Sequence, residues 1–199
     1  MIDHFPSKGN AGVTDPLSGR FSSAIPDVEL RVLDTIADDR GSFCETFRQS
    51  WFAGAPAFVQ GNASVSRPNV LRGMHYHLRQ DDLWLVLRGH VTVALADIRP
   101  AQKRRVERFD VTAGGGVYIP RGVAHGFYAH DDVLLIYYVT NYYDGTDELG
   151  IAWDDPDLAI PWPHRAPILS PRDHNNPRLR DIDRDKLPGE SRMSAREQG

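Results

Sequence analysis

Two histidines separated by a single residue, His75 and His77, are the side chains of this sequence with the clearest capacity for chemistry. An acidic residue follows them at Asp81 or Asp82, and a third histidine, His125, comes after a glycine-rich turn. Imidazoles and carboxylates in such a group can bind one divalent ion of iron, zinc, nickel or manganese. A histidine can also act as a general base near neutral pH. The residue types leave both chemistries open.

Alternation along a β-strand predicts that these groups share one surface. Side chains two residues apart lie on the same face of a strand, so His75, His77 and Arg79 are expected to face the same way. The order His75-x-His77, an acid, and His125 after Gly114-x5-Pro120-x-Gly122 resembles the two-part motif of the cupins. In that superfamily such residues can hold a metal, with His75, His77, Asp82 and His125 as the ligands here.

The elements that must position these residues are predicted to be short β-strands. Strand patterns separated by turn residues are typical of an all-β sandwich or barrel. We therefore expect an all-β, cupin-type jelly roll with short helical turns. The expected strands are Glu29 to Thr35, Ser42 to Phe47, Phe58 to Ser66, Leu71 to His77, Leu83 to Leu87, Val91 to Ala96, Val106 to Val111, Gly116 to Ile119, Ala124 to Ala129 and Val133 to Thr140.

One expected strand carries a row of polar side chains. Between Phe58 and Ser66, alternation places four of them on one side, namely Gln60, Asn62, Ser64 and Ser66. This pattern has two interpretations. It is typical of a half-exposed strand with one face in water, and it also fits a hydrogen-bonding wall inside a ligand cavity.

Composition limits the architecture and the classes of partner. A chain of 199 residues suits one domain, and we divide it into an arm (1–25), a cupin-like domain (26–174) and a weakly ordered charged tail (175–199). The formal net charge of −4 gives no support for nucleic-acid binding. The single cysteine, Cys44, permits neither an intrachain disulfide nor a thiolate cluster. The sequence shows no signal peptide or membrane span, so we expect a cytoplasmic protein that does not bind membranes.

Longer stretches of the sequence resemble the dTDP-4-dehydrorhamnose 3,5-epimerase family, whose members are cupin-shaped nucleotide-sugar epimerases. The resemblance runs from about residue 27 to residue 173. It rests on ordered segments that include Asp39-Arg40-Gly41-Ser42-Phe43-x-Glu45, Phe58-Val59-Gln60-x-Asn62, Val70-Leu71-Arg72-Gly73-Met74-His75-Tyr76, Ala124-His125-Gly126-Phe127, Thr140-Asn141-Tyr142-Tyr143, Ile160-x-Trp162-Pro163 and Leu169-Ser170-x-x-Asp173.

The resemblance implies an acid–base reaction at a carbon next to a ketone. Epimerisation there needs a base to remove the α-proton, a partner for the enolate oxygen, and an acid to return a proton to the opposite face. The family likeness makes His75 the base, Asp173 the carboxylate that bonds to its other ring nitrogen, and Tyr137 the proton donor. No cofactor or metal is implied.

The resemblance also implies a set of binding residues and a homodimer. Arg72 matches the arginine that contacts the substrate's diphosphate, and Arg40 matches one that reaches the neighbouring subunit's site. The full set of expected substrate contacts is Arg40, Phe43, Glu45, Gln60, Asn62, Arg72, His77, His125 and Tyr143. The expected substrate is a nucleotide-linked, 4-keto-6-deoxy sugar, with dTDP as the expected nucleotide.

The sequence departs from the family at two positions of the expected site. The active-site lysine of the family falls at Asp82, and the glutamine that follows its His-Tyr pair is His77. An anion at Asp82 would repel an enolate. Three outcomes stay open: His77 or Arg79 replaces the lysine, the chain catalyses a related reaction such as single epimerisation or 3,4-ketoisomerisation, or the group binds a metal.

Overall fold

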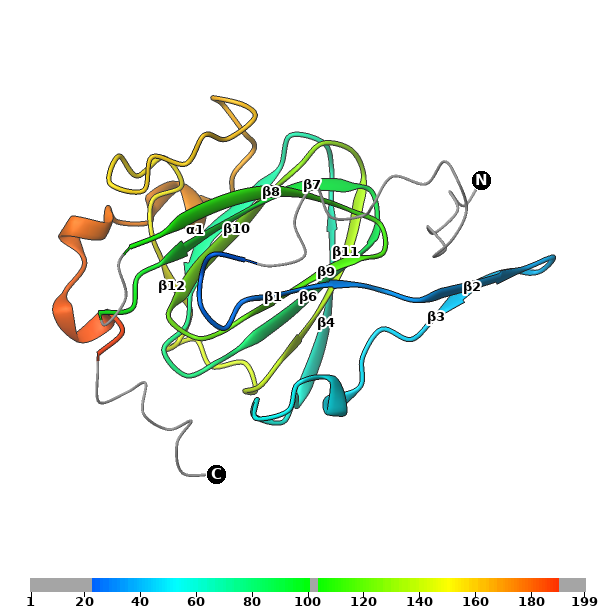
Figure 1. Ribbon diagram of the computed structural model, residues 1–199. Coiled ribbons are helices and arrows are strands. Elements are labelled where there is room, and N and C mark those ends of the chain that lie inside the picture. Colours follow the sequence, from blue (N-terminus) through cyan, green and yellow to red (C-terminus); the bar gives the residue numbers. More distant parts are fainter. Residues whose placement is uncertain (1–22, 101–103, 190–199) are drawn as a thin grey trace.

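Two sheets face one another to form the body of the protein. The computed structural model describes residues 23–100 and 104–189. One sheet has the strand order β1-β9-β6-β11-β4, and the other has the order β12-β5-β10-β7-β8 (Figure 1). The strands are β1 (Glu29–Val32), β4 (Gln60–Ser66), β5 (Leu71–Tyr76), β6 (Asp82–Arg88), β7 (His90–Asp97), β8 (Val106–Thr112), β9 (Gly115–Ile119), β10 (Val123–Ala129), β11 (Val133–Val139) and β12 (Leu149–Gly150). The predicted all-β jelly roll is confirmed.

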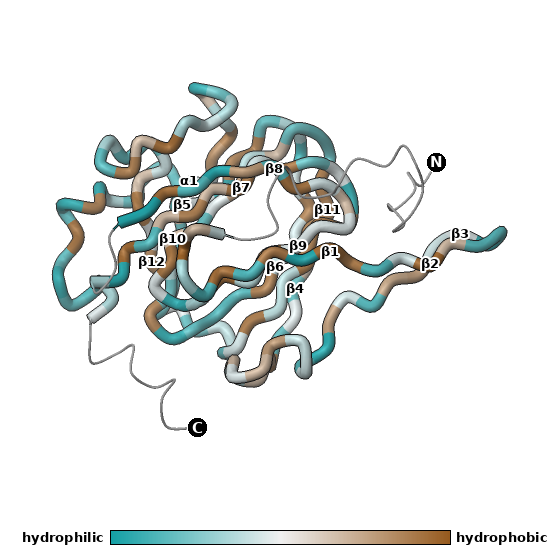
Figure 2. Tube along the Cα trace, in the orientation of Figure 1, coloured by the Kyte–Doolittle hydropathy of each residue, from teal (hydrophilic) through white to brown (hydrophobic). Residues whose placement is uncertain are grey.

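The main core fills the space between the two sheets. Its residues come from alternate positions on strands of both sheets, including Val93 and Leu95 on β7 and Val117 on β9. Alternation explains this, because every second side chain of a strand points inward. Figure 2 shows the apolar residues concentrated on the strands of the sheets and the polar residues on the outer loops.

Two smaller apolar clusters cover the outer faces of the sheets. Phe52 and Leu33 pack with Tyr118 outside the sheet that contains β6. Met74 and Tyr76 pack with Leu179 outside the sheet that contains β5. Leu179 begins η2 (Leu179–Asp181), which precedes η3 (Arg184–Lys186), so part of the predicted tail packs on the barrel. Because this region is densely charged, its composition did not predict a buried residue, yet Leu179 is only 6% exposed.

A two-stranded hairpin projects from the body of the protein. It consists of β2 (Thr35–Asp38) and β3 (Gly41–Cys44), followed by the short helical turn η1 (Gln49–Trp51). Figure 1 shows the hairpin extending away from both sheets. The predicted single strand Glu29 to Thr35 is therefore wrong. It is divided at Leu33, whose backbone N–H bonds to the carbonyl of Gly114 before the chain leaves the sheet.

Two glycines allow β5 and β10 to approach closely. A Cβ atom added to Gly73 would lie 2.6 Å from the Cα of Gly126, and one added to Gly126 would lie 2.8 Å from the Arg72 carbonyl oxygen. This close pairing brings His75 opposite His125 in the register of the two strands. Within residues 23–100 and 104–189, no helix is long and apolar enough to cross a membrane.

Candidate active site

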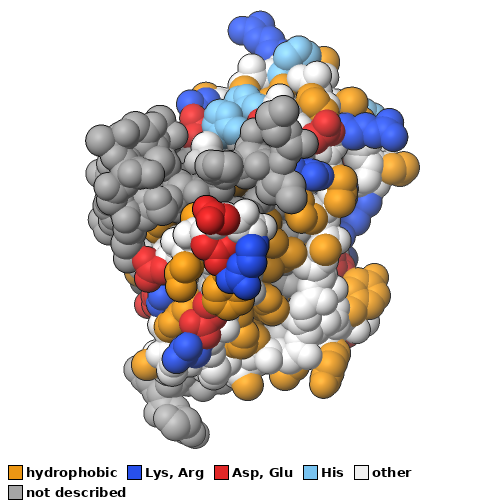
Figure 3. All heavy atoms as spheres, turned by 90° about the vertical axis from the view of Figure 1, so that its right-hand side faces the viewer, with side chains coloured by type: hydrophobic (Ala, Val, Ile, Leu, Met, Phe, Trp, Pro, Cys, Tyr) orange, Lys and Arg blue, Asp and Glu red, His pale blue; other side chains and the backbone are white. Residues whose placement is uncertain are grey.

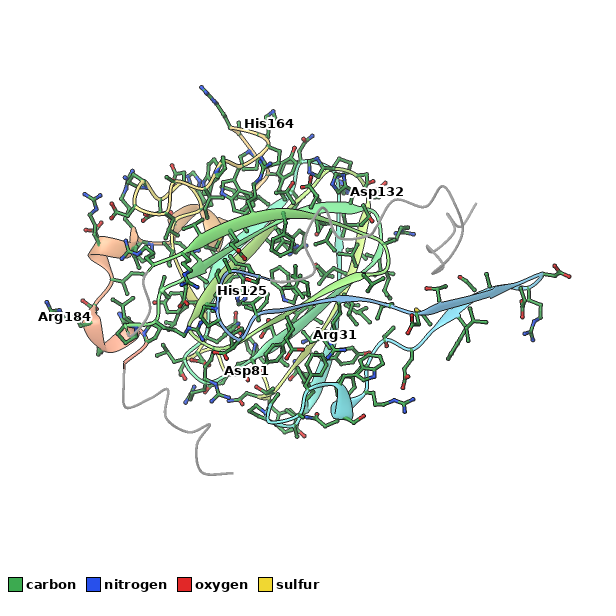
Figure 4. All side chains as sticks on the ribbon, viewed as in Figure 1. Arg31, Asp81, His125, Asp132, His164 and Arg184 are labelled. Atoms are coloured by element: carbon green, nitrogen blue, oxygen red, sulfur yellow. The ribbon has the colours of Figure 1, made fainter. Side chains whose placement is uncertain are left out.

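A cavity of about 240 Å³ opens between the two sheets. Strands of both sheets contribute to it, and the region around β12 and α1 (Pro171–Asn175) closes one side. The lining residues are Ser64, Arg72, His75, His77, Gln80, Asp82, Trp84, His125, Phe127, Leu135, Tyr137, Glu148 and Arg172. Figure 4 shows His125 within the barrel. The structure therefore brings together five of the expected catalytic and substrate-binding residues, namely Arg72, His75, His77, His125 and Tyr137, and with them Asp82.

His75 and Asp173 form a hydrogen-bonded pair at this cavity. The His75 Nε2 atom lies 2.6 Å from Asp173 Oδ1, and Asp173 is only 3% exposed. Asp173 is held in the first turn of α1, because its backbone N–H donates to the side-chain oxygen of Ser170, the N-cap residue of that helix. A carboxylate accepts hydrogen bonds, so His75 donates from Nε2 and its Nδ1 is left to accept a substrate proton.

The charge state of Asp173 suits this arrangement. Burial alone would raise the pKa of its carboxyl group, but the hydrogen bond and charge of His75, with further help from Ser170 and Arg172, lower the pKa overall. The carboxylate is therefore anionic at neutral pH. An anion at this position orients the imidazole and stabilises the imidazolium that forms when His75 takes a proton.

Tyr137 lies on β11, on the opposite sheet from His75. Burial raises the pKa of its phenol, and the charges of Asp82 and Glu148 raise it further, against a smaller opposite effect of Arg72. Its hydroxyl group therefore stays protonated across the neutral range. A protonated phenol in the cavity wall can donate a proton to a bound carbanion or enolate.

Two arginines provide cationic groups at the cavity. Arg72 donates from Nε to the Ser66 hydroxyl at 2.9 Å and from Nη2 to the Val65 carbonyl at 3.2 Å, which fixes its position. Arg172 donates from Nη1 to Glu148 at 2.8 Å. Planar guanidinium groups suit phosphate oxygens because they can donate two parallel hydrogen bonds.

His77, Asp82 and His125 form a second buried group in the same cavity. The Nε2 atoms of both histidines lie 3.9 Å from the Asp82 carboxylate, one from each oxygen. Burial lowers the pKa of His125 to about 4, despite an opposite effect of Asp82, so its ring is neutral near pH 7. His75 does not belong to this group, which corrects the four-ligand set expected from the cupin resemblance.

Gln60 and Asn62 lie beside the cavity rather than in its lining. Their side chains bond to one another at 2.9 Å, and Asn62 is paired with Tyr137 in the register of β4 and β11. The backbone N–H of Tyr143 donates to Gln60, but the Tyr143 side chain is 72% exposed. Of the polar row on this strand, Ser64 lines the cavity, so the cavity-wall interpretation holds for one of its four residues.

Other predicted site residues lie outside this cavity. Arg40 and Phe43 belong to the projecting hairpin, where Arg40 pairs with Asp38, and Glu45 pairs with Arg48. Their roles as substrate contacts stay predictions that require a second copy of the chain.

Arg79 does not face the cavity, so it cannot replace the family's lysine as suggested above. The strand ends at Tyr76, and the Arg79 guanidinium bonds to Asp144 at 2.5 Å and to Thr146 at 3.0 Å. The alternation expected from His75 to Arg79 therefore fails at its last member.

Sequence reasoning missed several residues of the lining: Ser64 as an individual contact, Gln80, Trp84, Phe127, Leu135, Glu148 and Arg172. Alternation could have found two of them, because Gln80 and Trp84 lie two positions on either side of Asp82. Glu148 and Arg172 come from loops and a short helix, where no periodic pattern marks which side chains face inward.

Comparisons with known proteins identify the family of this chain. The model of the dTDP-4-dehydrorhamnose 3,5-epimerase family matches residues 22–181. The chain is 38% identical over 176 residues to a dTDP-4-dehydrorhamnose 3,5-epimerase of Escherichia coli K12, covering 82% of this chain and 95% of the relative. It is 38% identical over 164 residues to the enzyme of the same name from Neisseria gonorrhoeae, covering 77% of this chain but only half of that relative.

A solved structure supports the same grouping. The fold is similar to dTDP-6-deoxy-D-glucose-3,5-epimerase of Legionella pneumophila in complex with dTDP-4-keto-L-rhamnose, with a TM-score of 0.76 and 32% identity. The match covers 84% of this chain and 96% of that one. With the fold, the histidine–aspartate pair and the family match in agreement, the chain belongs to the dTDP-4-dehydrorhamnose 3,5-epimerase family.

Proposed function

We propose that this protein epimerises a nucleotide-linked, 4-keto-6-deoxy sugar, with dTDP as the nucleotide, at C3, C5 or both. The observation that carries the proposal is the 2.6 Å contact between His75 and the buried Asp173 at a cavity between the sheets. A carbon next to a ketone loses its proton readily only when a base and a stabilised enolate are both available. This pair supplies the base.

The reaction follows from the positions of the two proton carriers. His75 removes the α-proton through Nδ1, while Asp173 holds the opposite side of the ring. Tyr137, on the facing sheet, returns a proton from the other side of the sugar, which inverts the configuration of the carbon. The raised pKa of Tyr137 keeps that proton available at neutral pH.

Binding of the substrate's diphosphate is assigned to the arginines at the cavity. Arg72 is already oriented by Ser66 and Val65. Arg172 provides a second guanidinium, and its neighbour Asp173 contacts the base, so phosphate binding and base positioning come from adjacent residues of one short helix. The family expectation for Arg72 is kept, and Arg172 is added to it.

We also propose that the protein is a homodimer in which the β2–β3 hairpin of each copy reaches the other. Within one copy, the Arg40 side chain is 89% exposed, and Phe43 is 69% exposed at the same hairpin. An aromatic side chain on a projecting hairpin leaves most of its apolar surface in water in a single copy, and a partner would cover that surface. The cytoplasmic location expected from the sequence stays a prediction, which fractionation of the producing cells would test.

Proton exchange tests the proposed reaction directly. The purified protein is incubated with a dTDP-4-keto-6-deoxyhexose in deuterium oxide, and the sugar is examined by proton NMR. Deuterium at C3 and C5 supports double epimerisation, and deuterium at one carbon identifies a single epimerisation. A sugar that binds but gains no deuterium at either carbon contradicts the proposal.

A further inference from the structure

The group formed by His77, Asp82 and His125 has no role in the acid–base steps assigned above. One nitrogen or oxygen atom from each residue lies within 4.8 Å of the other two, and all three residues are buried. They lie in the same cavity as His75. The family's enolate-stabilising lysine falls at Asp82 in this chain, so the chemistry of the group must differ from that of a lysine.

Hydrogen bonds fix which nitrogen of each histidine points at the carboxylate. His77 Nδ1 lies 2.7 Å from the carbonyl oxygen of Asp147, and His125 Nδ1 lies 2.9 Å from that of Val123. A carbonyl oxygen can only accept, so each Nδ1 carries the hydrogen and Nε2 of the neutral ring holds a lone pair. Both lone pairs are therefore available at the side of the ring that faces Asp82.

The carboxylate is held in the same way. Asp82 Oδ1 accepts from the Gln80 amide at 2.8 Å, and Oδ2 accepts from the Trp84 indole at 3.2 Å. Ligands of metal ions characteristically have such outer partners, which fix their orientation. All three residues of this group have one.

The distances favour a cation between these groups. Each Nε2 lies 3.9 Å from a carboxylate oxygen, which is too long for a direct hydrogen bond. An ion about 2.1 Å from both atoms would bridge any separation up to about 4.2 Å. Lone pairs on nitrogen and an anionic oxygen repel one another unless positive charge lies between them. The separation thus suits an ion with little movement of the side chains.

We propose that His77, Asp82 and His125 bind one divalent transition-metal ion, such as Zn²⁺, within the active-site cavity. Two imidazoles and one carboxylate favour Zn²⁺, Fe²⁺, Ni²⁺ or Mn²⁺ over Mg²⁺ and Ca²⁺, which prefer oxygen ligands. Three protein ligands leave at least one position open toward the cavity, as in catalytic sites.

The use of the ion rests on the proposed epimerase function. Such an ion supplies Lewis-acid polarisation of a carbonyl oxygen, which is the effect that the family obtains from a lysine cation. His75 lies outside the metal group, because its Nε2 is bonded to Asp173. The base and the metal ligands can therefore act at the same time.

Metal content provides the first test. Protein without a histidine tag is treated with a chelator, dialysed against Zn²⁺, freed of excess metal and examined by mass spectrometry for zinc. We expect about one equivalent of bound zinc per chain in the wild type. We expect at least a tenfold loss of zinc affinity in His77→Ala, Asp82→Asn and His125→Ala. Thermal unfolding of each metal-free variant shows whether it is folded, and the d–d spectrum of the Co²⁺-loaded protein reports nitrogen and oxygen ligands.

A second histidine cluster on the surface supplies the matched control. His90, Asp110 and His130 also lie close together, but the Thr92 hydroxyl already bonds to both Asp110 and His130. We expect His130→Ala to retain the zinc of the wild type. Equal zinc content in folded Asp82→Asn and wild type overturns the proposal, and so does zinc that is lost only in His130→Ala. A wild type that binds no zinc, with water bridging the 3.9 Å separations between each Nε2 and the Asp82 carboxylate, overturns it as well.

The same samples separate this inference from the proposed reaction. Deuterium incorporation is compared in metal-free and zinc-loaded wild type, and at least a tenfold increase with zinc is expected. Bound zinc with equal exchange rates overturns the catalytic use of the ion and leaves the epimerase proposal intact. Bound zinc with no exchange in either sample contradicts the epimerase proposal, while the metal site itself is retained.

Discussion

His75 depends on a partner that is distant in the sequence. Asp173 supplies a fixed negative charge and a fixed hydrogen-bond acceptor, so one ring nitrogen is committed and the other is left for the substrate. The base is therefore defined by a contact between two residues rather than by either residue alone.

Replacing the base should abolish the reaction without removing binding. We expect His75→Ala to lower deuterium exchange by on the order of a hundredfold or more, because the variant lacks the base that accepts the α-proton in the proposed reaction. Affinity for dTDP, measured by calorimetry, should change little. Arg72→Ala should show the opposite pattern, with weaker dTDP binding as the main effect. A His75→Ala variant that exchanges normally, or one that loses dTDP binding alone, contradicts these roles.

Asp173 should act through the orientation of His75. Asp173→Asn keeps the size of the side chain but loses the charge that stabilises the imidazolium, so we expect kcat to fall at least tenfold with a smaller change in KM. Steady-state kinetics across a range of pH measures both values. Unchanged kcat in a folded variant would show that the contact is only structural.

A separate buried ion pair should control stability in acid. Burial opposes ionisation of Asp81, but the hydrogen bonds and charge of Arg121, together with the Tyr118 hydroxyl, lower the pKa of its carboxyl group overall. A carboxyl group with a lower pKa in the folded state stabilises the protein above its unfolded pKa of about 4, and this stability is lost as the pH falls further.

Thermal unfolding across pH 2 to 7 tests this effect. The melting temperature of the wild type should fall below about pH 4, and Asp81→Asn should show a shallower fall over the same interval. Asp38→Asn is the control, because Asp38 pairs with Arg40 on the exposed hairpin and is not buried. An acid profile of Asp81→Asn that is parallel to that of the wild type would refute this explanation.

At the scale of elements, the contact between β5 and β10 determines the geometry of the site. These strands carry His75 and His125 in register, and Gly73 and Gly126 permit the backbones to lie unusually close. The short helix α1 is brought to the same place by a bridge between Val70 and Ile168, which precedes Asp173 in the chain. Backbone pairing thus sets the distance between the base and its carboxylate.

Gly126→Ala should disturb both stability and activity. The added methyl group would meet the Arg72 carbonyl oxygen at 2.8 Å and the Met74 sulfur at 3.0 Å, so β5 must move. We expect a loss of about 1–3 kcal/mol of unfolding free energy, measured by urea denaturation, and a lower kcat. Gly145→Ala is the control, because its methyl group would meet only the Tyr143 hydroxyl at 3.6 Å. Equal stability of the two variants would contradict the close-approach argument.

At the scale of the whole molecule, the β2–β3 hairpin carries apolar side chains that a single copy of the chain leaves exposed to water. Figure 3 faces the side from which the hairpin projects and shows hydrophobic side chains exposed among charged ones. Ile36 and Phe43 are each 69% exposed. Burial of these side chains against a second copy would remove apolar surface from water and stabilise a dimer.

Mixing two inactive variants tests whether the hairpin acts on the neighbouring copy. If Arg40 serves the partner's cavity, a heterodimer of His75→Ala and Arg40→Ala contains one complete site. We therefore expect deuterium exchange to recover after the two variants are unfolded and refolded together, but not when each is refolded alone. If Arg40 instead serves its own cavity, every site in the mixture has a defect and no recovery is observed.

Local patterns in the sequence were enough to predict the strands, the fold, the family and the base of this protein. Alternating apolar residues and turn residues predicted the strands, because the periodicity of a strand is written in neighbouring residues. The spacing of His75 and His77, and the ordered segments around them, predicted the fold, the family and the base. Only the tertiary structure decided what those patterns could not, because the deciding contacts join residues distant in the chain. In that structure His75 is bonded to Asp173, Arg79 faces the surface and Leu179 is buried. Asp82 lies between two histidines whose Nε2 lone pairs face it.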